Sequence, residues 1–234
     1  MSAADVRPLT ADDLDWVVEV TRQRRERLVT HAPRFWRPAA DATERHRAFL
    51  AHMVADEDTL TLRTEHGYLI AVERAGRLVV DDMVVDPPEH WATEGLRLLE
   101  RAGSTGRLRF VVPAAERERM DAALDLGLEP AEVWWHRDLE PPTGLNVVSE
   151  DPSMSVDGAA GQLVPAPPVY DPGGPVLLVT SVESADALTR IQQSAARRGA
   201  TVAVVTQDPA DTATAALLAD SGFVVTTYFF AAPA

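Results

Sequence analysis

Two adjacent carboxylates, Asp81 and Asp82, are the residues of this chain best suited to acid–base chemistry. They lie in a predicted strand, residues 78–85, that is mostly apolar and β-branched, as is typical of a strand buried on both faces. Adjacent strand residues face opposite sides, so only one of the two can point into a cleft. A carboxylate buried there would have a raised pKa and could accept a proton from an amine, which makes Asp82 the candidate base. The alternative is that both carboxylates lie at an edge or in solvent.

The predicted strand runs directly into a helix that has the form of an anion-binding site. Its residues recur at the spacing of a helix that faces a core: Trp91, Gly95, Leu98, Leu99 and Ala102. The first-turn amides of such a helix bind anions. However, Asp86 is a good N-cap and Glu89 lies at the third helical position, as in a capping box. Two carboxylates therefore compete for the amides that an anionic cofactor would use.

A loop and a Pro-rich segment could complete a site. The loop at residues 31–38 carries Arg34, Phe35 and Trp36, which would form the lip of a substrate pocket or plug the edge of the core. Tyr170 lies in the Pro-rich segment and is a candidate catalytic proton donor. The alternative for Tyr170 is that it packs that segment.

The composition excludes several kinds of chemistry. The 234 residues include neither cysteine nor lysine, which excludes disulfides, thiolate nucleophiles and Schiff-base catalysis. The net charge of −14 argues against nucleic acid as a partner. His46 and His52 lack the i, i+4 spacing that places two ligands on one helix face, so we expect no metal site. No apolar run is long enough to cross a membrane and no signal peptide begins the sequence, so we expect a cytoplasmic protein without membrane partners.

The pattern of elements predicts an α/β (α+β) fold in three segments. In residues 1–140, strands and helices alternate, beginning with a strand at residues 6–10 and a helix capped by Thr10. Residues 141–174 are rich in Pro, Gly, Ser and Asp and are predicted to be a linker or covering loop. Residues 175–234 then give strand, helix, strand, helix and strand.

The third segment matches the end of the first at a spacing of about 94 residues. Trp134 and Trp135 align with Tyr228 and Phe229, for example. Internal duplication, followed by loss of the front half of the second copy, explains this match. The alternative is that two generic β-α-β-α-β runs resemble each other by chance.

In its order of elements, and in the segment Val84-Val-Asp-Pro-Pro-Glu-His-Trp-Ala-Thr-Glu-Gly95, the chain resembles the GNAT superfamily of GCN5-related acyl-CoA N-acyltransferases. The resemblance implies a mixed central sheet flanked by helices, followed by a second, partial unit. It also implies acetyl-CoA or another acyl-CoA as co-substrate, and a small-molecule or peptide amine as acceptor. The pantetheine would pair with the strand that holds Val84 and Val85. The pyrophosphate would lie on the following turn, at His90, Trp91, Ala92, Thr93, Glu94 and Gly95.

The chain also departs from the pattern of that family. Of the usual turn, Arg/Gln-x-x-Gly-x-Gly/Ala, only Gly95 matches. The Tyr that often protonates the departing thiolate is replaced by Ala123 in the first unit and by Leu218 in the second. These departures favour a second hypothesis, in which the chain is a catalytically silent GNAT-like pseudoenzyme. It would then act as a binding, regulatory or scaffold protein, as a homodimer or with a protein partner.

Overall fold

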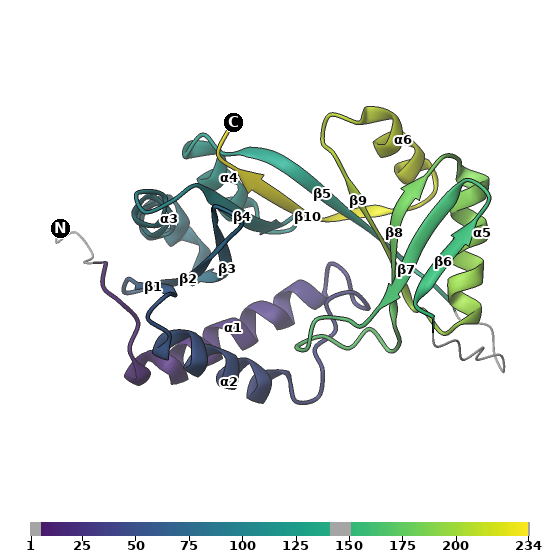
Figure 1. Ribbon diagram of the computed structural model, residues 1–234. Coiled ribbons are helices and arrows are strands. Elements are labelled where there is room, and N and C mark those ends of the chain that lie inside the picture. The colour runs from purple at the N-terminus through teal and green to yellow at the C-terminus, as the bar shows by residue number, and fades with distance from the viewer. Residues whose placement is uncertain (1–5, 141–150, 234) are drawn as a thin grey trace. The chain divides into compact units, whose positions relative to one another are not determined.

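The computed structural model describes residues 6–140 and 151–233 (Figure 1). These residues form two compact units, and each unit draws on separate parts of the chain. Unit 1 contains the residues up to Glu26, Thr43–Ala131 and the residues from Thr227 onward. Unit 2 contains Arg27–Ala42 and Glu132–Thr226. None of the helices in the described ranges is long and apolar enough to cross a bilayer.

Unit 1 is built on a mixed sheet. The strands β1, β2 and β3 form an antiparallel meander, β3 pairs in parallel with β4, and β4 pairs antiparallel with β10. Parallel neighbours need a crossover connection, which the helix α3 provides between β3 and β4. In sheet order the strands are β1 (Leu60–Arg63), β2 (Gly67–Arg74), β3 (Arg77–Val85), β4 (Leu108–Pro113) and β10 (Val224–Ala231).

Helices cover both faces of the unit 1 sheet (Figure 1). On one face, α1 (Leu14–Val29) and α2 (Ala42–Ala55) bury Val17 and Leu50 against Tyr68 of β2. On the other face, α3 (Leu96–Gly103) and α4 (Arg117–Asp125) bury a second core that contains Leu98 and Phe110. A short 3-10 turn, Ala11–Asp13, leads into α1, and its capping box of Thr10 and Asp13 is formed as predicted.

Unit 2 repeats the order of strand pairings. Here β6, β7 and β8 form the meander, β8 pairs in parallel with β9, and β9 pairs antiparallel with β5. The helices α5 (Ala185–Arg197) and α6 (Thr212–Asp220) pack on one face around Leu177, Ile191 and Val205. The strands are β5 (Glu129–Asp138), β9 (Val202–Gln207), β8 (Val176–Val182), β7 (Ala159–Val164) and β6 (Ser153–Val156).

The strand that completes each sheet comes from a distant part of the chain. In unit 1 the strand next to β4 is β10, at the end of the described sequence. In unit 2 the strand next to β9 is β5, which directly follows the elements of unit 1 in the sequence. Each unit therefore needs a segment that simple division of the sequence would assign to the other.

Two sequence-based assignments differ from the structure. The segment predicted as a linker or covering loop, residues 141–174, contains two strands: β6 pairs with β7, and β7 pairs with β8. The first ten residues of this segment lie outside the described ranges. The predicted first strand at residues 6–10 is reduced to an isolated bridge between Arg7 and Arg63. The mixed α/β fold with helix-flanked sheets is confirmed, whereas the duplication stays a prediction.

The start of the helix after β3 is irregular. A 3-10 turn, Pro88–His90, is followed by a π turn, Trp91–Gly95, before regular α3 begins. Trp91 is buried at 6% exposure and its ring lies against the Cα of Gly95. A Cβ added at Gly95 would lie 2.4 Å from Trp91 Cε3, so only glycine fits while the indole stays in place.

We predict that Gly95→Ala lowers the free energy of unfolding by about 1–3 kcal/mol, because the indole is locked in a packed core. Gly103→Ala is the matched control in the same helix, since an added Cβ there comes no closer than 3.4 Å to Leu108. That variant should change stability by less than about 1 kcal/mol. Urea denaturation measures both, and equal midpoints for the two variants would contradict the expected clash.

Candidate functional site

A β-bulge in β3 lies at the Asp81–Asp82 pair. Ile70 is opposite Asp82 and Ala71 is opposite Val80, so Asp81 is the extra residue on its strand. The bulge shifts the alternation of side chains, and Val80 and Met83 accordingly lie in the same core although they are three residues apart. The strict alternation predicted for Asp81 and Asp82 therefore fails here.

Asp82 is held in a buried hydrogen-bond network. Its Oδ2 accepts a hydrogen bond of 2.8 Å from the Tyr68 hydroxyl and lies 2.7 Å from Nε2 of His46 on α2. Burial by itself would raise the pKa of Asp82, but the hydrogen bond and charge of His46, with Arg24 and Tyr68, lower it to about 2. The predicted raised pKa is thus wrong for Asp82. Burial raises the pKa of Asp81, although this residue is more exposed than Asp82.

An arginine of α4 bridges β3 and β4 where their pairing ends. The two strands pair only over Leu78–Val80 and Leu108–Phe110. Beyond that point Arg119 donates 2.7 Å and 2.8 Å hydrogen bonds to the carbonyls of Met83 and Val111. Its side chain is 2% exposed, and burial, together with the charge of Arg24, lowers its pKa to about 9.

Aromatic rings enclose the same guanidinium. Its central carbon lies 4.6 Å from the ring centroid of Phe110 and 5.4 Å from that of Trp91. Cation–π attraction of this kind strengthens when the cation is desolvated. Arg119 is therefore both hydrogen-bonded and packed in place.

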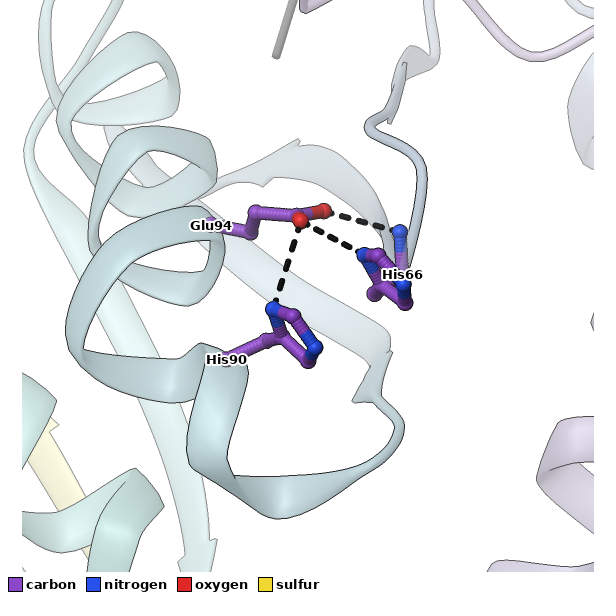
Figure 2. A group of neighbouring side chains, drawn as sticks. All are labelled: His66, His90 and Glu94. Atoms are coloured by element: carbon purple, nitrogen blue, oxygen red, sulfur yellow. Dashed lines mark hydrogen bonds and ion pairs between the residues drawn. The ribbon is translucent and has the colours of Figure 1, made fainter. Parts of the chain in front are cut away.

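The turn after β3 is not capped as the sequence suggested. Pro87, and not Asp86, holds the N-cap position of the 3-10 turn, and proline has no side-chain acceptor. The amide of Asp86 instead donates to the carbonyl of His66. A different carboxylate approaches the turn, because buried Glu94 accepts hydrogen bonds from the amide and Nδ1 of His66 (Figure 2).

The fold of this chain can be compared with those of known structures. A candidate acetyltransferase from Thermoplasma acidophilum is similar at 12% identity and a TM-score of 0.59, over 98% of this chain and 100% of that one. A GCN5-related N-acetyltransferase from Sphaerobacter thermophilus is similar at 10% identity and a TM-score of 0.57, over 99% and 95%. This chain has the GNAT fold. No family profile matches the sequence, and no curated protein is significantly similar to it.

A third GNAT-fold relative shows the same extent of similarity. A candidate acetyltransferase from Pyrococcus horikoshii aligns at 11% identity and a TM-score of 0.53, over 99% of this chain and 89% of that one. All three alignments run through both units. The fold predicted from the resemblance is therefore confirmed for the chain as a whole.

Most residues predicted to hold the cofactor are buried in this GNAT fold. Val84 and Val85 are 2% exposed, and Trp91, Glu94 and Gly95 are buried as well. His90 is partly exposed, and Ala92 and Thr93 are the exposed positions of the turn. Within residues 90–95, the small side chains of Ala92 and Thr93 are thus exposed, and the carboxylate of Glu94 is buried.

The residues predicted to bind substrate lie in unit 2, where they separate into two groups. Phe35 packs on Trp36 and His136, and Trp36 packs on Tyr170 at 5.2 Å between ring centroids. Arg34 instead bonds the carbonyl of Leu139 and the carboxylate of Glu140. Tyr170, the candidate donor, is thus part of an aromatic cluster in unit 2, whereas Asp82 belongs to unit 1.

The aromatic cluster of unit 2 lines an apolar cavity of about 460 Å³. Its floor is the sheet face that α5 and α6 do not cover, formed by Val176, Leu178, Val202 and Val204 of β8 and β9. The Pro-rich segment around residues 164–172 closes it, together with Phe35, Trp36, Trp134 and Tyr170. Among the described residues, no charged side chain contributes to the lining.

Sequence reasoning missed His46, Arg119 and His66. His46 was considered only as a metal ligand, because nothing local indicates contact with a residue 36 positions away. Arg119 did leave a signal: it recurs with Ala122 and Ala123 on the buried stripe of α4, where an arginine is unusual. For His66, the available signal was in its partners: His90 and Glu94 are four residues apart, a spacing that places two side chains on one helix face.

We predict that Asp82→Asn lowers the free energy of unfolding at pH 7 by about 2 kcal/mol. The pKa of Asp82 is about 2 in the folded state, whereas the ordinary pKa of this carboxyl group is 3.8. A depressed pKa stabilises the fold above the unfolded-state pKa, and this is lost as the pH falls through the folded-state pKa. The deficit of the variant should therefore be constant above about pH 4 and shrink toward pH 2.

Asp81→Asn provides a control of opposite sign. Burial raises the pKa of Asp81, so its ionised form costs stability at neutral pH. This variant should be as stable as the wild type or more stable at pH 7. Urea unfolding from pH 2 to pH 7 measures both variants, and a pH-independent deficit for Asp82→Asn would contradict the assignment.

Proposed function

We propose that this chain is a non-catalytic GNAT-fold protein that binds a neutral, apolar small molecule in unit 2. The cavity lined by Phe35, Trp36, Tyr170 and the face of β8 and β9 that α5 and α6 do not cover carries this proposal. Its volume of about 460 Å³ falls in the range of roughly 300–1,000 Å³ typical of small-molecule sites. The sequence led to the hypothesis of a pseudoenzyme that acts as a binding, regulatory or scaffold protein, and this proposal takes the first of these three roles.

The lining restricts the class of ligand. Apolar walls cannot solvate a charged group, and burying an unpaired charge is strongly unfavourable. Aromatic side chains on one side and branched aliphatic side chains on the other favour a flat ring system or a hydrocarbon chain. The Tyr170 side chain offers a polar atom that could orient such a ligand.

Arg119 supports the non-catalytic part of the proposal. The resemblance to GNAT enzymes implies that pantetheine pairs with the backbone of β3 around Val84. The carbonyl of Met83 already accepts from Arg119, whose side chain is buried between Trp91 and Phe110. An entering pantetheine would have to displace a guanidinium that holds two hydrogen bonds, and each such bond to a charged group is worth about 1.5–3 kcal/mol.

The second candidate is an acyl-CoA-dependent N-acyltransferase that transfers an acetyl group to a small-molecule or peptide amine. The contact between Asp82 and His46 favours it, because a carboxylate that orients an imidazole can prepare it as a base. His46 Nδ1 has no hydrogen-bond partner within the described residues. In this scheme the amine nitrogen attacks the thioester carbonyl, its proton passes to His46, and the thiolate of CoA leaves.

We predict that the wild-type chain binds the neutral fluorescent probe 1-aminoanthracene and that Leu178→Trp abolishes this binding, since the larger side chain fills the cavity. Leu178→Met is the matched control, because it preserves volume and should retain affinity within about threefold. Fluorescence titration measures both variants, and circular dichroism confirms that they are folded. Equal affinity in Leu178→Trp and wild type would place the probe elsewhere and contradict the proposed site.

The two candidate functions differ in their response to acetyl-CoA. For the non-catalytic protein, calorimetry should detect no saturable binding of acetyl-CoA up to about 1 mM. Saturable binding, with acetyl transfer to an amine that His46→Ala and Asp82→Asn abolish, would reject the first candidate in favour of the second. His52→Ala, which changes an exposed histidine of the same helix, is the control.

A further inference from the structure

Two histidines and a glutamate of unit 1 converge at the turn after β3 (Figure 2). Glu94 Oε1 lies 2.7 Å from Nδ1 of His66 and 3.5 Å from Nδ1 of His90. The two imidazole rings stack with centroids 3.8 Å apart and planes 4° from parallel. One ligand atom from each residue can be chosen so that all three lie within 4.8 Å of one another.

From this geometry we infer that His66, His90 and Glu94 form a site for a divalent transition-metal ion, of which Zn²⁺ fits best. Two imidazole nitrogens and one carboxylate are a donor set that Zn²⁺ uses where a fourth position stays open. This inference is independent of the proposed ligand site in unit 2. It also replaces the sequence-based expectation of no metal, which considered His46 and His52 alone.

The observed distances are close to those that a tetrahedral ion requires. Zinc–ligand bonds of about 2.0–2.2 Å imply ligand atoms roughly 3.4 Å apart. The separation of 3.5 Å between Glu94 and His90 already meets this value, and the 2.7 Å separation of Glu94 and His66 needs to open by less than about 1 Å. At least one imidazole would have to rotate out of the stacked arrangement to convert the hydrogen-bonded cluster into a coordination site, because a bound ion lies in the plane of each ring.

Without an ion, the cluster satisfies its histidines unequally. His66 makes a hydrogen bond of 2.7 Å to Glu94, whereas the 3.5 Å separation from His90 to the same oxygen is long for one. A cation bound to both Nδ1 atoms would give each imidazole a partner, because a metal ion takes neutral imidazoles as ligands.

The surrounding structure holds the three ligands in place. His90 ends the 3-10 turn Pro88–His90, and Glu94 lies four residues later in the π turn Trp91–Gly95 that follows it. The other carboxylate oxygen of Glu94 accepts from the amide of His66, and the carbonyl of His66 accepts from the amide of Asp86. Outer hydrogen bonds of this kind orient metal ligands. Both imidazole side chains are 31% exposed and Glu94 is 7% exposed, so an ion could enter from the histidine side.

The test uses the tag-free full chain, freed of metal by a chelator and titrated with ZnCl₂ by calorimetry. We expect one ion per chain, and His90→Asn and Glu94→Gln should each weaken binding by about 100-fold or more. His52→Asn, at an exposed histidine of α2, should bind as the wild type does. Zinc should also raise the Tm of the wild type and of His52→Asn, but not of the two site variants.

Co²⁺ titration of the wild type provides a test that does not depend on whether the variants fold. The intense visible absorption of tetrahedral Co²⁺ is expected, and its loss on adding Zn²⁺ would show that both ions share one site. Absence of saturable Zn²⁺ binding, absence of that absorption, or unchanged affinity in folded His90→Asn and Glu94→Gln would each overturn the inference. In each of these cases the cluster would have only a structural role, as a set of hydrogen bonds that joins His66 to the turn after β3.

Discussion

The buried guanidinium of Arg119 is the contact on which unit 1 most depends. Parallel strands β3 and β4 stop pairing after Val80 and Phe110, and the backbone groups beyond them need other partners. Arg119 supplies these donors from α4, to Met83 on one strand and Val111 on the other. One side chain thereby joins a helix to two strands where a sheet alone would be incomplete.

A buried arginine is stable only if its charge is compensated. Its partners here are two carbonyls, two aromatic rings and Glu116, which lies 3.6 Å away and also pairs with Arg24 of α1. Removing one partner of such a group leaves an unsatisfied buried charge, which is far more costly than the net gain from the intact contact. The same arrangement that completes the fold therefore opposes the entry of any other backbone-pairing ligand at this position.

Asp82 illustrates the same principle with the opposite charge. Its burial alone would favour the neutral acid, but His46 from α2 and Tyr68 from β2 stabilise the carboxylate. The carboxylate consequently joins α2 to the sheet through a polar contact inside an apolar layer. A group stabilised so strongly as an anion is a weak proton acceptor, and any base function would pass to the imidazole that it orients.

Local patterns predicted the features that depend on local physics. The buried stripe of α3 and the Thr10–Asp13 capping box both follow from residues within one or two turns. The fold class followed from element order. The strands β6 and β7 were missed because their short, Gly- and Ser-containing sequences become strands only by pairing, β7 with β8 and β6 with β7.

Partners far apart in sequence account for the errors at the candidate site. The pKa of Asp82 depends on His46, and the environment of Glu94 depends on His66, which lies 28 residues earlier. Asp86 was expected at the N-cap, but Pro87 holds that position, and the amide of Asp86 donates to the carbonyl of His66. A pattern within one segment cannot show which distant segment satisfies its polar groups.

The cavity of unit 2 follows from what covers its sheet. A mixed sheet needs apolar cover on both faces, and in unit 1 helices provide both covers. In unit 2, α5 and α6 cover one face, while the Pro-rich segment and the Phe35–Trp36 loop cover the other. Proline lacks an amide donor and has a fixed φ, so this segment can neither extend the sheet nor pack as a helix against β8 and β9. Covering by such a segment excludes water without filling the space, and that is the physical reason an apolar cavity persists there.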